Sequence, residues 1–144
     1  MDKQLLCATD GSHVSQKAVN YAVGLAHRLQ VPITFLVVHP VEDDSSMDPV
    51  RSWDGNVIEA MDWQVHKDLA DAQSIAKEAG LTQVTLAAIG SHEVAEAIVK
   101  YAEGHGLDHI LVGSTGRSGV AKMMLGSVAS RVVTLAHCPV TVVR

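Results

Sequence analysis

The chain has 144 residues, which is enough for one domain with a buried core and too few for two. Hydrophobic residues make up 47% of it and aromatic residues only 3%, so the core must be built from Val, Leu, Ile and Ala. The formal charge of −5 combines 11 scattered basic residues with 16 acidic ones, which gives little support to nucleic-acid binding through phosphate neutralisation.

The first part of the chain predicts a strand, a helix and a second strand. Residues 4–9 (QLLCAT) form an aliphatic strand that Asp10-Gly11-Ser12 ends. Either Ser12 or Ser15 is suited to cap the following helix, whose apolar residues recur at intervals of three and four. Residues 33–38 (ITFLVV) then form the second strand.

The middle of the chain predicts a loop, two helices and a strand. Residues 39–55 are acidic and contain two prolines and three serines, which indicates a surface loop. Residues 56–79 carry an apolar stripe typical of a helix, and a glycine follows it. Residues 84–89 (VTLAAI) form the third strand, and we expect Gly90-Ser91 to open the next helix.

The last part predicts a strand at 109–112, a helix at about 127–136 and a closing strand at 140–143 (VTVV). Strands separated by helices of this length are most simply parallel, with right-handed crossovers. The sequence therefore predicts a doubly wound α/β fold with five parallel strands and helices on both faces. Ligands of such sheets bind at the carboxyl ends of the strands, which here are Thr9-Asp10-Gly11, Val38-His39 and Gly113 onward.

The stretch from Gly113 to Ser127 (GSTGRSGVAKMMLGS) is the most informative. It starts where a strand ends, and Gly113 and Gly116 should let backbone amides approach a ligand closely and adopt positive φ. Gly126 and Ser127 place amide groups and a hydroxyl at a helix start, where an anion is favoured. An ordinary turn is the alternative, but the strand–loop–helix context favours a polyphosphate site.

Several competing motifs are absent from the sequence. It has no G-x-x-x-x-G-K-[ST] loop, no G-x-G-x-x-G after the first strand and no G-x-S-x-G elbow. His105 and His109 have the spacing of helical metal ligands, but Gly106 and a strand start separate them. P-loop phosphoryl transfer, dinucleotide oxidoreduction, serine hydrolysis and a histidine metal site are therefore disfavoured.

The spacing Gly113-x2-Gly116-x9-Gly126-Ser127 resembles the ATP-binding signature of universal stress proteins. The flanking segments agree with that family, namely Asp10-Gly11-Ser12, LDHILVGSTGRSG, LGSVASRVV and HCPVTVVR. The resemblance covers residues 1–144 as a single nucleotide-binding domain and implies the sheet order 3-2-1-4-5. Sequence spacing alone does not give that order.

The resemblance also implies a site for ATP, with Mg²⁺ or Mn²⁺ bridging the phosphates. Asp10 would sit against the nucleotide, and Ala8 and Thr9 would line the adenine side; Ala8 stands where other members often carry a proline. Val38 would offer its backbone to the adenine edge. The ribose and phosphates would be held by residues of the loop and the helix start: Gly113, Thr115, Gly116, Gly126, Ser127, Val128 and Ala129.

These expectations describe a nucleotide-binding regulatory or stress-response protein rather than an efficient enzyme. The sequence shows no base poised to activate water and no arginine finger. Slow ATP hydrolysis or autophosphorylation on serine is the enzymatic alternative. An adenylating enzyme of the related superfamily is disfavoured, because no S-G-G-x-D-S, HIGH or KMSKS-like motif is present. The downstream partner cannot be read from the sequence.

The expected compartment is the cytoplasm. No apolar stretch approaches the roughly 20 residues that a membrane span needs. The first eleven residues show neither a long apolar segment nor a small-residue cleavage site, so we expect no signal peptide. Only two cysteines are present, Cys7 and Cys138, and we expect both to pack as thiols without forming a disulfide.

The closing strand predicts a homodimer. Residues 140–143 are β-branched and carry no charge, and in the family's sheet order they lie at an edge. The unpaired N–H and C=O groups of such an edge invite the same strand of a second copy, related by a two-fold axis. The family resemblance supports the same dimer, and a monomer with a solvated edge is the alternative.

Overall fold

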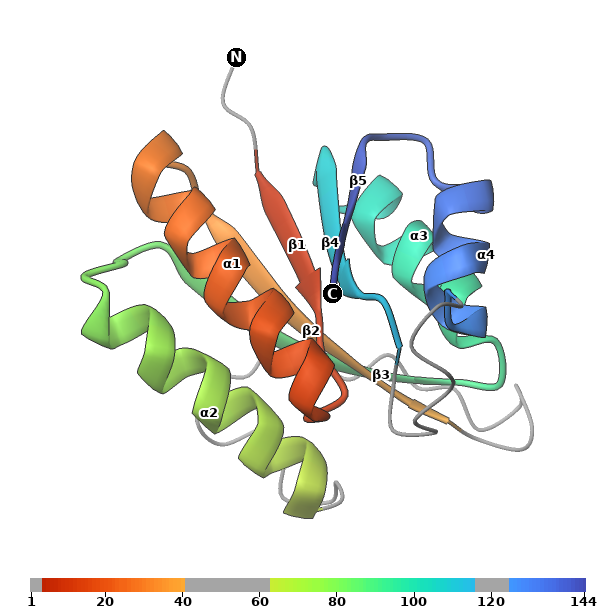
Figure 1. Cartoon of the computed structure of the whole chain (residues 1–144), viewed down its shortest axis with the longest axis horizontal. Helices are drawn as coiled ribbons and strands as arrows, with labels where there is room; N and C mark the ends of the chain where they lie inside the picture. The colour runs from red at the N-terminus through yellow and green to blue at the C-terminus, as the bar shows by residue number, and fades with distance from the viewer. Residues whose placement is uncertain (1–3, 41–62, 116–124) are drawn as a thin grey trace.

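The computed structural model describes residues 4–40, 63–115 and 125–144. Within these residues five parallel strands form one sheet in the order β3-β2-β1-β4-β5, which confirms the predicted fold class and strand order. The helices α1 and α2 cover one face of the sheet, and α3 and α4 cover the other (Figure 1). In chain order the elements are β1 (Leu5–Ala8), α1 (His13–Leu29), β2 (Ile33–Pro40), α2 (Trp63–Glu78), β3 (Val84–Ser91), α3 (Val94–Gly104), β4 (His109–Gly113), α4 (Ser127–Leu135) and β5 (Val140–Val143).

The central strand β1 divides its side chains between two aliphatic cores. Leu5 and Cys7 are fully buried in the core beneath α1 and α2, whereas Leu6 and Ala8 belong to the core beneath α3 and α4. This alternation follows from the two-residue period of a strand. Because both faces are covered, the strand reads as a continuous apolar run, as the composition predicts.

The first turn of α1 shows which of the two serines is the cap. Ser12 has extended backbone angles, and its hydroxyl accepts a hydrogen bond from the amide of Ser15 at 3.2 Å. Ser12 is therefore the N-cap. Ser15 lies inside the helix, where its side chain is buried against the end of β1.

The expectation that Gly90-Ser91 opens a helix is wrong. Both residues continue β3, where Gly90 pairs with His39 and Ser91 with Pro40 of a longer β2. Pairing with β2 keeps this segment extended, and α3 begins only at Val94. The predicted helix at 56–79 corresponds to α2 from Trp63 onward, and its first seven residues lie outside the described part of the chain. The predicted loop at 39–55 loses its first two residues to β2, and the rest of it also lies outside.

The two cysteines are free thiols, as predicted, and they belong to opposite faces of the sheet. Cys7 lies in the core beneath α1 and α2, whereas Cys138 packs against the core beneath α3 and α4. Burial raises the pKa of the Cys7 thiol to about 12, so this thiol stays protonated at neutral pH. None of the described helices is long and apolar enough to cross a membrane.

Candidate functional site

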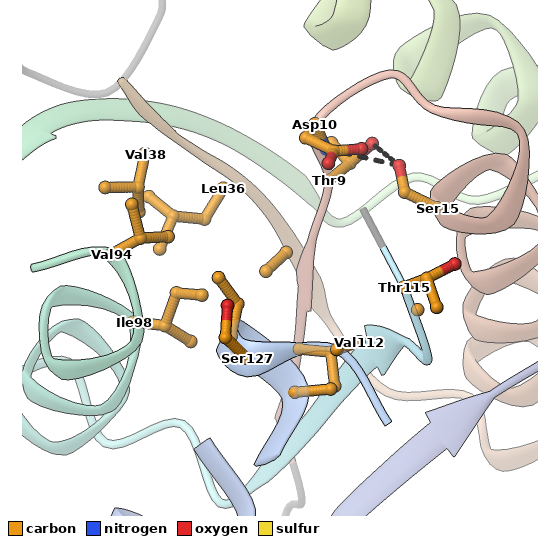
Figure 2. Close-up of a pocket in the computed structure, with 15 residues that line it drawn as sticks. Thr9, Asp10, Ser15, Leu36, Val38, Val94, Ile98, Val112, Thr115 and Ser127 are labelled. Carbon is orange, nitrogen blue, oxygen red and sulfur yellow. Dashed lines mark hydrogen bonds between the residues drawn. The ribbon is translucent and has the colours of Figure 1, made fainter. Parts of the chain in front are cut away.

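A cavity of about 210 Å³ opens at the carboxyl ends of β1, β2 and β4. The chain leaves β1 through α1 toward β2 on one side, and it leaves β4 through α4 toward β5 on the other. The gap between the ends of β1 and β4 is thus the point where the strand order reverses, which is where ligands of open α/β sheets bind. Figure 2 shows the lining side chains converging on this point from both faces of the sheet.

One wall of the cavity is apolar. Leu36 and Val38, two residues apart on β2, face the same side of the sheet as Val94 and Ile98, which are one turn apart on α3. Figure 2 shows these four side chains grouped together on one side of the cavity. They extend the core beneath α3 and α4 into the cavity, and they form a surface suited to the face of an aromatic ring.

The start of α4 forms a second, polar wall. Gly126 is the N-cap, and because it has no side chain it leaves the helix without a side-chain cap. The amides of Ser127, Val128 and Ala129 occupy the first three helical positions, which have no acceptor within a helix. No described residue accepts a hydrogen bond from them. These amides, together with the helix dipole, make the site favourable for an anion.

Ser127 is the first residue of the helix, directly after the N-cap. Its side chain lies at the cavity, beside Ile98 in Figure 2. The amide of Gly126 donates a 2.7 Å hydrogen bond to the carbonyl of Ser114, which holds the helix start against the end of β4. A Cβ atom on Gly126 would lie only 3.0 Å from that carbonyl oxygen, so a larger residue would push the helix start and the end of β4 apart by a few tenths of an ångström.

Gly113 also differs in detail from the sequence-based expectation. Among the described glycines, positive φ is found at Gly11, Gly80 and Gly106 and not at Gly113. The constraint at Gly113 is instead one of space, because a Cβ atom there would lie 3.1 Å from Cγ1 of Val14 in α1, closer than an ordinary contact.

The connection from β1 to α1 forms the third side of the site. The hydroxyls of Thr9 and Ser15 are joined by a 2.7 Å hydrogen bond, and Asp10 accepts from the amide of Ser12 at 2.9 Å. Gly11 turns the chain with φ of +77°. A Cβ atom at Gly11 would overlap the buried carboxylate of Asp68 from α2, so two separate constraints require glycine here.

Ten of the residues that the sequence singled out surround this one cavity. Gly116 lies outside the described part of the chain. Ala8 packs against the core beneath α3 and α4, whereas the Thr9 hydroxyl bonds to Ser15 of α1. The ten residues at the cavity are Ala8, Thr9, Asp10, Val38, Gly113, Thr115, Gly126, Ser127, Val128 and Ala129.

Five lining residues did not emerge from the sequence: Ser15, Leu36, Val94, Ile98 and Val112. Leu36 could have been predicted from Val38, because side chains two residues apart on a strand point to the same face of the sheet. Nothing in the sequence distinguishes Ile98 from the other apolar residues of its helix, and Val94 was not singled out at all. Asp10 is the only acidic residue among the described lining residues, and the described chain holds no cluster of three or more His, Cys, Asp or Glu side chains suited to a metal.

The sequence model of the Universal stress protein family matches residues 1–144. The Bacillus subtilis universal stress protein YxiE is 37% identical over 150 residues, with both chains covered completely. The universal stress protein MJ0531 of Methanocaldococcus jannaschii is 32% identical over 144 residues, which cover 99% of this chain and 82% of that protein.

Solved structures of lower identity share the fold. A universal stress protein in complex with cAMP superposes with a TM-score of 0.72 at 22% identity and covers 99% of this chain and 97% of its own. The universal stress protein of Archaeoglobus fulgidus in complex with dAMP superposes with a TM-score of 0.65 at 24% identity and covers 100% and 98%. The family model and both relatives match essentially the whole sequence. The chain therefore belongs to the universal stress protein family.

Proposed function

We propose that this chain binds ATP in the cavity and that the bound nucleotide sets a regulatory state in a stress response. The observation that carries the proposal is the position of the uncapped start of α4, whose free amides share one cavity with an apolar wall. An adenine ring packs against that wall, and phosphates accept from the amides of Ser127 and Val128. The cAMP and dAMP complexes of family members support an adenine nucleotide as the ligand.

The backbone of Val38 supplies the contact that selects adenine. Leu36 accepts a hydrogen bond from the amide of Thr9, so the polar backbone groups of Leu36 face β1. The backbone groups of Val38, two residues further along β2, face the same way. They have no partner in β1, because the pairing of β1 with β2 ends at Ala8 and Leu36. Val38 therefore presents one N–H donor and one C=O acceptor toward the cavity, a pattern that matches the N1 and N6 edge of adenine.

Within this proposal a metal ion would supply positive charge that neutralises the phosphates, and this chain would offer it few ligands. Asp10 is the only carboxylate among the described lining residues, so a Mg²⁺ or Mn²⁺ ion would take most of its ligands from ATP and water. Apart from Asp10, the described lining holds no titratable side chain, so it contains no His or Lys base and no arginine finger. We therefore propose a nucleotide binder. Slow hydrolysis or autophosphorylation is the enzymatic alternative, and a measurement of ATP turnover over hours distinguishes the two.

The proposal extends to the assembly and the compartment. We propose a homodimer joined along β5, since β5 lies at the edge of the sheet and pairs with β4 on one side. We also propose the cytoplasm as its compartment.

Ser127→Ala tests the anion site with little change to the fold. The hydroxyl lies at the cavity and makes no hydrogen bond to any described residue, so we expect the variant to keep its thermal stability. Loss of one hydrogen bond to a phosphate should weaken ATP binding by about 1 kcal/mol, or roughly fivefold. Isothermal calorimetry measures this. Ser130→Ala, one turn further along α4 and away from the cavity, is the matched control and should bind like the wild type. Equal affinities for the wild type and Ser127→Ala would contradict the placement of the phosphates.

A further inference from the structure

Two buried hydroxyl groups at the edge of the cavity form a pair that the proposed contacts do not use. Thr9 at the end of β1 and Ser15 in the first turn of α1 are 7% and 4% exposed, and their oxygens are 2.7 Å apart. Both residues line the cavity, and Figure 2 shows the bond between them next to Asp10.

Among the described residues, one of the two hydroxyl hydrogens of this pair has no acceptor. The amide of Asp10 donates to Ser15 Oγ, and the amide of Gly11 donates to Thr9 Oγ1, each at 3.2 Å. One hydroxyl hydrogen forms the bond between the two oxygens, and no described residue accepts the second. Within the described residues, the pair therefore holds one free O–H donor on one member and one free lone pair on the other. Reversal of the internal bond exchanges the two.

A buried O–H group without an acceptor is unfavourable, so the pair is suited to an acceptor atom that a ligand brings. The nearby carboxylate of Asp10 disfavours a phosphate at this position, because like charges repel. A neutral hydroxyl group fits better, since its oxygen accepts from the free O–H and its own hydrogen is donated to Asp10 or to the free lone pair. In a nucleotide, the groups of this kind are the ribose hydroxyls.

The place of the pair in the site agrees with a ribose contact. In Figure 2 the apolar wall formed by Leu36 and Val38 lies on one side of the cavity, while Thr9 and Ser15 lie on the other. Ser127, at the start of α4 where the phosphates are proposed to bind, lies below both groups in this view. A ribose links the base to the phosphates. If the base packs on the apolar wall and the phosphates bind at α4, the ribose hydroxyls are free to contact Thr9 and Ser15.

We propose that the Thr9–Ser15 pair donates a hydrogen bond to a ribose hydroxyl of the bound nucleotide and thereby favours ribonucleotides over deoxyribonucleotides. This inference rests on the proposed ATP site. It assigns a ligand contact to Ser15 and places the side chain of Thr9 at the sugar rather than at the base.

The test compares ATP, 2′-deoxy-ATP and 3′-deoxy-ATP by calorimetry on the wild type and on variants of the pair. We expect one of the two deoxynucleotides to bind the wild type about tenfold more weakly than ATP, the effect of losing a buried hydrogen bond. In the double variant Thr9→Val with Ser15→Ala, we expect that difference to fall below about twofold, because neither residue retains a donor. Thr9→Ser keeps both hydroxyls and is the matched control, which should preserve the difference.

Two results would overturn the inference while leaving the ATP site intact. One is equal binding of all three nucleotides to the wild type. The other is an undiminished preference for ATP in the double variant, which would mean that other groups read the sugar. If the double variant does not fold, the single variants Thr9→Val and Ser15→Ala replace it, and at least one of them must reduce the preference. Failure of the wild type to bind any of the three would instead contradict the proposed function itself.

Discussion

Gly113→Val is expected to lower the affinity for ATP by about two orders of magnitude, because it forces the start of α1 away from the end of β4. A Cβ atom at this position lies 3.1 Å from Cγ1 of Val14 and 3.3 Å from the amide nitrogen of Ser15. These distances are already shorter than ordinary contacts, and the two methyl groups of valine add to the overlap. The chain relieves it by shifting the first turn of α1, which carries Ser15 and follows Asp10, so the cavity loses its third side.

The matched control is Gly24→Val in the middle of α1. A Cβ atom at Gly24 meets no atom within 4 Å, and valine is a better helix residue than glycine, so this variant should bind ATP like the wild type. Gly113→Ala should lie between the two, since it adds the tight contact without the two methyl groups. Calorimetric titration of all four proteins gives the comparison. An unchanged affinity in Gly113→Val would show that the end of β4 takes no part in the site.

Val142→Pro is expected to convert the proposed dimer into a monomer, whereas Thr141→Pro should weaken the sheet within each chain. The two variants differ because the backbone N–H and C=O groups of Val142 and Thr141 point in opposite directions. The carbonyls of Pro139 and Val143 accept hydrogen bonds from the amides of Ile110 and Ser114, at the two ends of β4. Backbone groups of a strand alternate in direction, so those of Thr141 also face β4, and those of Val142 face away from the sheet.

Proline removes one N–H group and adds the bulk of its ring. At Val142 this loss falls on the outer edge, where a second chain would pair, and at Thr141 it falls on the bond to β4. Light scattering should therefore give twice the 15.3 kDa chain mass for the wild type and a single chain mass for Val142→Pro. Thermal unfolding should show the larger loss of stability in Thr141→Pro. A wild-type mass near 15.3 kDa at micromolar concentration would refute the dimer.

The class of the fold could be predicted from the sequence, but the order of the strands could not. Continuous aliphatic runs such as residues 33–38, separated by amphipathic helices, indicate a parallel sheet covered on both faces. Nothing in that spacing says that β1 lies between β2 and β4, because each crossover helix has the length to place the next strand on either side. Only the resemblance to a family supplied that information. Gly90-Ser91 was misassigned for a related reason, since the pairing with β2 that keeps them extended is not visible locally.

The site was predictable where local sequence determines it. The glycine at 126 and the helix that follows it indicate an anion site by themselves, and the structure places there amides that have no acceptor among the described residues. Ser15 was read only as a possible cap, because its contact with Thr9 depends on how α1 packs against the end of β1. For the same reason Gly113 was assigned a positive φ, although its actual constraint is the proximity of Val14, which is distant in sequence.

The most direct test of the central proposal is equilibrium dialysis of the wild-type chain against radiolabelled ATP in the presence of Mg²⁺, after removal of any nucleotide carried through purification. The free amides at the start of α4 and the apolar wall beside them predict saturable binding of one ATP per chain, displaced by unlabelled ATP. GTP should displace it poorly, because the backbone donor and acceptor of Val38 do not match the guanine edge. A bound fraction that stays at background with ATP up to about 1 mM, the weakest affinity consistent with a specific site, would contradict the account.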